Sequence, residues 1–260
     1  MVTPGRVNRF EALKAGRDPL SLIGDLDRFA RAGVESMPPD DVERLKMWGV
    51  AIRPKTPGYF MLRVRIPAGQ TGAGQVRTLG QIADKFGRGT ADITSRAQLQ
   101  LRWIRLADVP EVFRRLHDCG LATLQTLMDS VRNIRGCPLA GVSPHEAFDA
   151  TPVIRAVERL VVGQRDAANL PRKMNIAITG CTHHCCDADV QDLSLVPARR
   201  LVGGSVTLGF NVLVGGKMSA GDHHLAQPLG AFVTPDEAPA LVHAIIALFR
   251  DHGPRQTRTR

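Results

Sequence analysis

The run LPRKMNIAITGCTHHCC, residues 170–186, joins a strand-like segment to a cluster of cationic, amide, thiol and imidazole side chains. Side chains alternate between the two faces of a β-strand, so Lys173 and Asn175 are expected to lie on one face. The strand-like part, residues 174–179, ends at Gly180 in a turn rich in cysteine and histidine. This pattern predicts a sheet edge that borders a buried anion or a metal cofactor.

The chain has 260 residues, and 43% of them are hydrophobic. This composition is sufficient for one large or two small domains with a sizeable core. No apolar run reaches the roughly 18–20 residues of a membrane-spanning helix, and the N-terminal segment lacks the apolar centre of a signal peptide. We therefore expect a cytoplasmic protein without a membrane partner.

The formal net charge of +9 suits an acidic partner protein, a polyanionic cofactor, an anionic substrate or nucleic acid. Nucleic acid is disfavoured, because two Trp, one Tyr and nine Phe provide few platforms on which bases could stack. The arginines also lie within strand-like segments and do not form one basic run.

The predicted elements divide the chain into three parts. Residues 1–50 predict an N-terminal helical extension, with short helices at 19–32 and 40–48. Residues 51–125 predict a ferredoxin-like half-domain of α+β type. Its expected elements are a strand at 59–66, a helix at 75–86, strands at 91–94 and 99–104, and a helix at 109–116.

Residues 126–260 predict a second unit, again with mixed helices and strands. Its expected elements are a helix at 144–162, strands at 174–179, 190–196, 207–216 and 227–233, and a helix at 235–250. The fold class that follows is α+β.

Four basic residues lie on or beside predicted strands: Arg63, Arg96, Arg132 and Lys173, with Asn175 as a neutral donor. A single strand arginine most often lies on a solvated face or pairs with a surface carboxylate. Apolar neighbours of Arg63 and the apolar strand after Lys173 favour partial burial instead. Several cations around one point would hold a small oxyanion and stabilise charge as it is reduced or protonated.

Six segments, in this order and spacing, resemble the N-terminal half of the sirohaem-dependent nitrite and sulfite reductases, and the ferredoxin-dependent nitrite reductases most of all. They are MLRVRIPAG, TSRAQLQLRWI, VRNIRGCPLAG, LPRKMNIAITGC, GFNVLVGG and HGPRQTR. The resemblance covers about residues 58–258. It implies a ferredoxin-like half-domain followed by a sirohaem-type reductase domain, and it departs from the family at Ala68 and Met174.

The resemblance implies roles for individual residues. Arg63 and Arg132 match arginines that bind the anionic substrate at the sirohaem iron, and Lys173 matches a lysine of that set. Asn175 stands where sulfite reductases tend to carry a further lysine and nitrite reductases an asparagine, which favours nitrite. The catalytic set implied by the family is therefore these four residues.

Two further residues, Arg65 and Arg96, match positions that face sirohaem and its carboxylates. The implied reaction is the six-electron reduction of nitrite to ammonia in nitrate assimilation, with ferredoxin or a similar acidic protein as electron donor. The implied cofactors are sirohaem and a [4Fe–4S] cluster. Because the family's chains are much longer and hold their cluster ligands in a second half, we expect a fragment or one half of a split enzyme, with the cluster ligated by the missing C-terminal half, which could be a separate partner chain.

The five cysteines are Cys119, Cys137, Cys181, Cys185 and Cys186. An odd number with three crowded together is a poor disulfide framework and favours thiol or metal chemistry in a reducing compartment. By resemblance, Cys137, Cys181 and Cys185 occupy places pseudo-equivalent to cluster ligands of the family's second half, and Val131 occupies the fourth place.

Three interpretations of these cysteines remain open. They could be structural residues left from an internal duplication. They could hold a [4Fe–4S] cluster through Cys137, Cys181, Cys185 and Cys186. They could also bind zinc through the last three of these with His183 or His184, since thiolate and imidazole suit tetrahedral zinc.

The alternatives to a nitrite reductase are a sulfite reductase of the same family, a non-catalytic zinc- or anion-binding module, and a precorrin-processing enzyme with the same fold. The cysteine-rich turn and the basic surface motivate the binding module.

Overall fold

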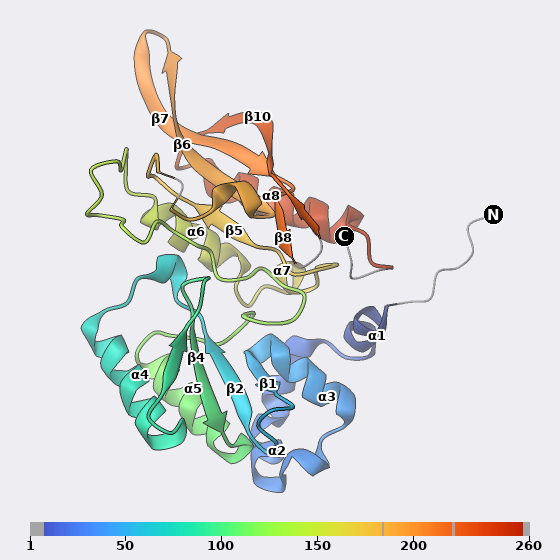
Figure 1. The fold of residues 1–260 in the computed structure, drawn as a ribbon. Coiled ribbons are helices and arrows are strands. Elements are labelled where there is room, and N and C mark those ends of the chain that lie inside the picture. Colours follow the sequence, from blue (N-terminus) through green and yellow to red (C-terminus); the bar gives the residue numbers. More distant parts are fainter. Residues whose placement is uncertain (1–7, 184, 220–221, 257–260) are drawn as a thin grey trace, which may run out of the picture.

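The structure, a computed structural model, describes residues 8–183, 185–219 and 222–256. Two units, each a sheet with helices packed against it, lie one above the other, and a group of short N-terminal helices lies beside the first (Figure 1). Among the described residues, no helix is both long enough and apolar enough to cross a bilayer.

The first unit is a four-stranded antiparallel sheet with two long helices packed against it. In the order β1-β2-β4-β3, its strands are β1 (Val50–Ile52), β2 (Phe60–Val64), β4 (Leu99–Ile104) and β3 (Ala91–Ile93), and its helices are α4 (Ala73–Phe86) and α5 (Val109–Asp118). Leu62 on β2, Ile82 on α4 and Leu116 on α5 are fully buried in one core. The predicted order strand–helix–strand–strand–helix is thus confirmed.

The N-terminal extension forms α1 (Arg9–Gly16), α2 (Leu26–Ala32) and α3 (Pro39–Arg44), with the 3-10 helices η1 (Pro19–Asp25), η2 (Val34–Ser36) and η3 (Leu45–Trp48). The side chains of Asn8 and Asp18 accept backbone N–H groups at the starts of α1 and η1, as helix caps do. Leu22 and Phe29 are fully buried in the core of the first unit. The predicted short helices are confirmed, and they complete the first unit's core.

The second unit is a mixed four-stranded sheet. In the order β10-β7-β6-β5, its strands are β10 (Gln227–Val233), β7 (Ser205–Val214), β6 (Leu193–Val202) and β5 (Ile176–Ile178). Only the β5–β6 pair is parallel. The helices are α6 (Thr151–Val161), α7 (Arg165–Ala168) and α8 (Ala238–His252), and the short strand β8 (Lys217–Ser219) pairs antiparallel with β9 (Asp222–His224). Strand β5 is buried at every position, as the apolar run IAI predicts.

A segment without regular structure, residues 119–136, connects the two units. The N–H of Arg65 donates to the carbonyl of Ala122 at 2.7 Å, and the Asn133 amide bonds both the N–H and the carbonyl of Ile66. Further along, the N–H of Arg132 donates to the carbonyl of Met174 at 2.8 Å. The segment therefore brings β2, with Arg63, close to the entry of β5, with Lys173.

One predicted helix is wrong at its start. We expected a helix over residues 144–162, but α6 begins at Thr151. Residues 144–150 instead pair with the turn after β5. The N–H of Ala147 donates to the carbonyl of Gly180, and the backbone of Glu146 forms an antiparallel β-bridge with that of Cys181. The Asp149 carboxylate accepts the N–H of Thr151, the first residue of α6, at 2.8 Å.

Candidate functional site

The guanidinium of Arg63 lies on β2 opposite Gln100 of β4 and donates from Nη2 to the Gln100 Oε1 at 3.3 Å. Its Nε is buried and has no hydrogen-bond partner. Burial lowers the pKa of Arg63, because a desolvated cation loses the stabilisation that water provides. Arg63 thus has donor capacity that the protein does not use.

Arg96 lies in the tight turn between β3 and β4 and reaches the second unit. Its Nη1 donates to the Gln191 Oε1 at 3.1 Å. Burial is the largest cause that lowers the pKa of Arg96, and repulsion from Arg135 and Arg63 lowers it further. Attraction from Asp192 partly offsets these effects. The structure therefore brings this predicted residue close to Arg63.

Arg132, in the connecting segment, is 9% exposed. Its two Nη atoms donate to the carbonyls of Thr126 and Met128, while its Nε has no partner. Burial, followed by repulsion from Arg63 and Arg96 against attraction from Asp129, lowers the pKa of Arg132 to about 9. Burial is the largest cause of this lowered pKa, and the neighbouring arginines add a smaller repulsion.

Lys173 and Asn175 lie just before β5. Burial lowers the pKa of Lys173, and repulsion from Arg132 and Arg96 lowers it further. The backbone N–H of Asn175 donates to the Asp192 Oδ2 at 2.8 Å, whereas its side-chain Oδ1 is buried without a partner. Lys173 therefore lies with the other cations, and Asn175 is bonded to Asp192, whose charge acts on Lys173 and Arg96.

The four cations (Arg63, Arg96, Arg132 and Lys173) form one group, which we call the basic cluster. None of the ion pairs among the described residues joins a member of this cluster to a carboxylate. Partly buried cations that repel one another are costly unless an anion is bound between them. The cluster and its orphaned polar atoms therefore fit an anionic ligand, including a cofactor that carries carboxylates.

Arg65 does not fit the role expected for it. Its guanidinium donates to the Glu158 Oε1 at 2.7 Å and to four backbone carbonyls, in a site where the residue is 3% exposed. All its N–H groups are therefore occupied within the protein. It joins β2, the connecting segment and α6, and has no donor left for a cofactor carboxylate.

Three of the cysteines meet between the loop before α6 and the turn after β5. The Sγ atoms of Cys137, Cys181 and Cys185 all lie within 4.8 Å of one another, a group we call the cysteine trio. Burial, with a smaller contribution from the neighbouring thiols, raises the pKa of Cys137 to about 11.

Cys186 does not belong to this group. It is buried against Ala177 and Ala188, and burial raises the pKa of its thiol to about 11. Val131 occupies the place of the family's fourth cluster cysteine. It is fully buried, and its backbone forms a parallel β-bridge with that of Met174. The described cysteines therefore do not supply the four ligands expected of a [4Fe–4S] cluster.

The sequence did not point to Gln100, Gln191 or Asp192 as parts of the site. Gln100 and Gln191 orient two arginines of the basic cluster, and Asp192 anchors the backbone before β5. Gln100 lies within a segment that resembles the family, but its contact with Arg63 depends on the register between β2 and β4.

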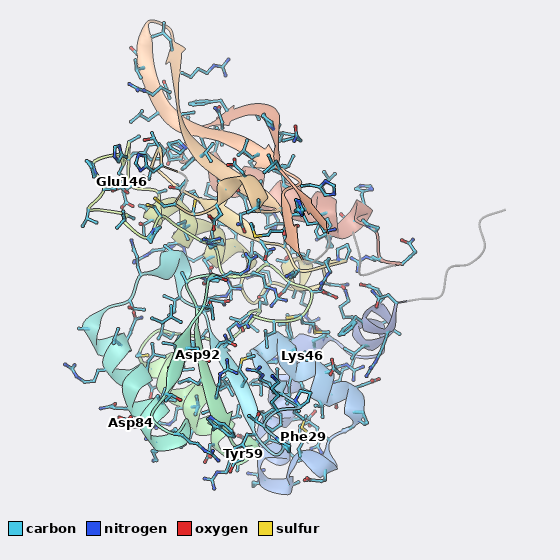
Figure 2. The ribbon with its side chains drawn as sticks, viewed as in Figure 1. Phe29, Lys46, Tyr59, Asp84, Asp92 and Glu146 are labelled. Atoms are coloured by element: carbon cyan, nitrogen blue, oxygen red, sulfur yellow. The ribbon has the colours of Figure 1, made fainter. Side chains whose placement is uncertain are left out.

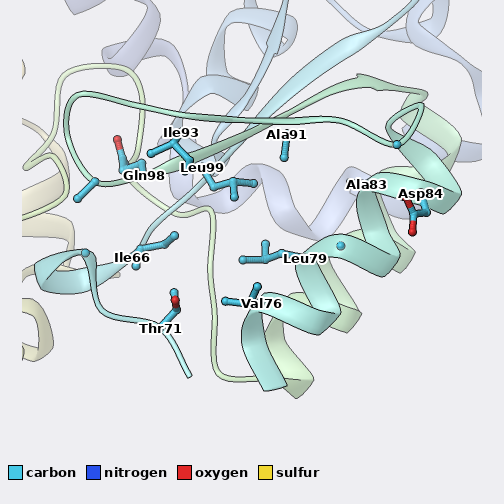
Figure 3. A pocket seen from close by; sticks show the side chains of 14 residues that line it. Ile66, Thr71, Val76, Leu79, Ala83, Asp84, Ala91, Ile93, Gln98 and Leu99 are labelled. Atoms are coloured by element: carbon cyan, nitrogen blue, oxygen red, sulfur yellow. The ribbon is translucent and has the colours of Figure 1, made fainter. Parts of the chain in front are cut away.

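A cavity of about 490 Å³ lies between α4 and the strands β3 and β4 (Figure 3). Its walls are mainly apolar and include Ile66, Val76, Leu79 and Leu99. Thr71, Asp84 and Gln98 are its polar side chains, and no member of the basic cluster lines it. It therefore offers little of the chemistry expected of an anion site.

Fold and site together describe an α+β protein in which partly buried cations from both units and the connecting segment lie in one group. Residues 127–260 match the family model described as the nitrite and sulphite reductase 4Fe-4S domain, and residues 52–119 match the nitrite/sulfite reductase ferredoxin-like half domain. The chain belongs to the nitrite and sulfite reductase family, whose members are oxidoreductases. The expected family and α+β fold are thus confirmed.

Several relatives of known name match almost the whole chain. A ferredoxin–nitrite reductase of Leptolyngbya laminosa is 44% identical over 95% of this chain and 49% of its own length. A sulfite reductase [ferredoxin] of Mycobacterium tuberculosis is 34% identical over 98% of this chain and 48% of its own. This chain therefore spans about half the length of these relatives.

Two solved structures resemble the fold. The Mycobacterium tuberculosis NirA protein matches 97% of this chain and 48% of its own, with a TM-score of 0.88 and 34% identity. Dissimilatory sulfite reductase I covers 97% of this chain and 86% of its own, with a TM-score of 0.64; its 13% identity shows a shared fold only. The description of the matched family model supports an iron–sulfur cofactor, and the cysteine trio lies within the matched residues.

Proposed function

We propose that this chain provides the basic, sirohaem- and substrate-facing side of a ferredoxin-dependent nitrite reductase that reduces nitrite to ammonia in the cytoplasm, with its [4Fe–4S] cluster ligated by a C-terminal half like that of its longer relatives. The observation that carries the proposal is the basic cluster, in which cations from β2, the β3–β4 turn, the connecting segment and the entry of β5 repel one another. Such a cluster is suited to an oxyanion beside a carboxylate-rich cofactor.

The residues of the chain divide the work between binding and proton supply. Arg63 and Arg96 are held by Gln100 and Gln191, so their remaining donors are oriented before the anion arrives. Arg132 is held by two backbone carbonyls and adds positive charge to the site. Sirohaem, when bound, supplies the iron at which nitrite is reduced.

Lys173 is the proton donor in this proposal. Reduction of nitrite to ammonia consumes protons, and an ammonium with a lowered pKa releases its proton more readily at neutral pH. Its deprotonated amine is then recharged from solvent, because Lys173 is only partly buried. Positive charge on the surface would also steer an acidic ferredoxin toward the protein.

Sulfite reduction is the second candidate, since a sulfite reductase is among the relatives. The residue at position 175 distinguishes nitrite from sulfite reduction in this proposal. A lysine in place of Asn175 would add a positive charge, which favours sulfite, the more highly charged anion. We expect Asn175→Lys to lower kcat/KM for nitrite and to raise it for sulfite, each by about tenfold.

The test uses the complete protein, produced in cells that make sirohaem. We expect haem absorption and nitrite-dependent oxidation of reduced methyl viologen, with ammonia as the product. Lys173→Met and Arg63→Met should each lower kcat/KM by about 100-fold, whereas Lys55→Met, at an exposed position outside the site, should leave it unchanged. Protein that binds no haem, or that reduces neither anion, would contradict the proposal.

A further inference from the structure

The cysteine trio is assembled from two loops that backbone hydrogen bonds hold together. Cys137 begins the loop before α6, and Cys181 and Cys185 lie in the turn after β5. The N–H of Thr182 donates to the carbonyl of His145 at 3.0 Å, and the N–H of Ala147 donates to that of Gly180 at 2.8 Å. The three thiols are therefore positioned by the fold and do not meet by side-chain flexibility alone.

The spacing of the sulfur atoms distinguishes two kinds of metal centre. A single tetrahedral ion with Zn–S bonds of about 2.3 Å places its sulfur ligands about 3.8 Å apart. A four-iron cluster keeps its ligand sulfurs farther apart, because the iron atoms lie between them, and it needs four ligands. Three sulfurs within 4.8 Å of one another fit the single ion and do not fit the cluster.

The same two loops carry imidazoles that could complete a tetrahedral site. The rings of His145 and His183 are stacked, with centroids 3.7 Å apart and 16° between their planes. His183 lies between Cys181 and Cys185 in sequence, within one turn. Ser143 also directs its hydroxyl to within 3.6 Å of the Cys181 Sγ. Imidazole is the better zinc ligand of these groups. The ring nitrogens of His183 lie outside the group of thiols within 4.8 Å of one another, so the ring has to rotate away from His145 to reach an ion held there.

We propose that Cys137, Cys181 and Cys185 bind one thiophilic divalent ion, zinc, with the imidazole of His183 as the fourth ligand. The site is separate from the basic cluster and does not depend on the proposed reductase activity. Glu146 forms a backbone β-bridge with Cys181 and therefore shows where the site lies. It is on a loop of the second unit, far from Tyr59 and Asp92 of the first unit (Figure 2).

A bound ion would link two segments of the chain that each carry a residue of the basic cluster. Cys137 follows Arg132 by five residues, and Cys181 follows β5, whose entry carries Lys173. Binding energy from a structural ion contributes directly to folding. The ion would therefore stabilise the second unit and preserve the positions of both cations.

The experiment measures metal on the chain purified without added metal and without an affinity tag that binds metals. Elemental analysis should find one zinc per chain without matching iron or acid-labile sulfide. Cobalt exchanged for zinc should give the intense thiolate-to-cobalt and d–d absorption of a tetrahedral site. Because this spectrum is recorded on the unaltered chain, it does not depend on whether any variant folds.

The variants assign the ligands. Cys137→Ser, Cys181→Ser and Cys185→Ser should lose the zinc, while Cys119→Ser and Cys186→Ser should keep it. His183→Ala should keep three thiolates but shift the cobalt d–d bands, and His145→Ala should not. Iron with labile sulfide, a chain without metal and without tetrahedral cobalt bands, or equal loss of zinc in Cys186→Ser would each overturn the proposal.

Discussion

Arg65 and Glu158 form an ion pair of 2.7 Å between β2 of the first unit and α6 of the second, with side chains only 3% and 9% exposed. The remaining donors of Arg65 go to carbonyls of the connecting segment. A pair buried to this degree is costly to break, because removal of one partner leaves an unpaired charge away from water. Its place between the units makes it a structural link.

The first prediction concerns this pair. Glu158→Ala should lower the free energy of unfolding by about 3–5 kcal/mol, since it leaves the Arg65 guanidinium buried and unpaired. Urea denaturation followed by circular dichroism measures the change. Asp118→Ala, which removes an exposed partner of Arg114, is the control and should change stability by less than about 1 kcal/mol. Equal effects of the two substitutions would show that the buried pair is not a link between the units.

The second prediction separates the two effects of a cation in the basic cluster. Lys173→Met should raise the free energy of unfolding of the chain without ligand, on the order of 0.5 kcal/mol, because repulsion from Arg132 and Arg96 disappears. The same substitution should weaken nitrite binding. Thermal unfolding with and without nitrite measures both. A variant that loses stability and binds nitrite as tightly as the parent chain would contradict the assignment of Lys173.

The third prediction is a pH dependence. The pKa of Lys173 is lowered from 10.5 by burial and by repulsion from Arg132, so the free chain loses this charge at lower pH than an ordinary lysine does. Nitrite affinity should be highest below this lowered pKa and should fall as pH rises through it. Lys173→Arg should keep its affinity to higher pH, since a guanidinium holds its proton longer.

The same shift has a consequence for stability, with a fixed sign. A base with a lowered pKa in the folded state binds fewer protons than in the unfolded state, between the two pKa values. In that window the contribution of Lys173 to the free energy of unfolding should rise with pH. The difference in the free energy of unfolding between the parent chain and Lys173→Met, measured from pH 7 to pH 10.5, isolates this contribution. A difference that stays constant over this range would show that the pKa of Lys173 is not lowered.

The fourth prediction tests the close approach of the turn after β5 to the loop before α6. A Cβ at Gly180 would collide with the carbonyl of Phe148, so Gly180→Ala should cost about 1–3 kcal/mol of stability. The matched control is Gly80→Ala on α4, where a Cβ meets open space and should stabilise the helix by about 0.5–1 kcal/mol. Chemical denaturation of both variants checks the opposite signs, and a neutral Gly180→Ala would mean that the two loops are not in contact.

Local pattern predicted most of the elements, because apolar periodicity reports which face of a helix or strand is buried. Strands β4 and β10 have the predicted bounds, and α4, α5 and α8 lie within three residues of theirs. The helix expected over residues 144–162 is too long at its start, because residues 144–150 pair with the turn after β5. That pairing is a tertiary contact, and sequence periodicity does not report it.

The sequence by itself determined the α+β class, the order of the elements and the residue types of an anion site, since these follow from local periodicity and from the resemblance of ordered segments. Only the tertiary structure decided which candidates meet. It brought Arg63, Arg96, Arg132 and Lys173 together, committed Arg65 to Glu158, and separated Cys186 from the cysteine trio. The physical reason is that strand register and loop packing fix where a side chain ends, and both depend on contacts between residues far apart in the chain.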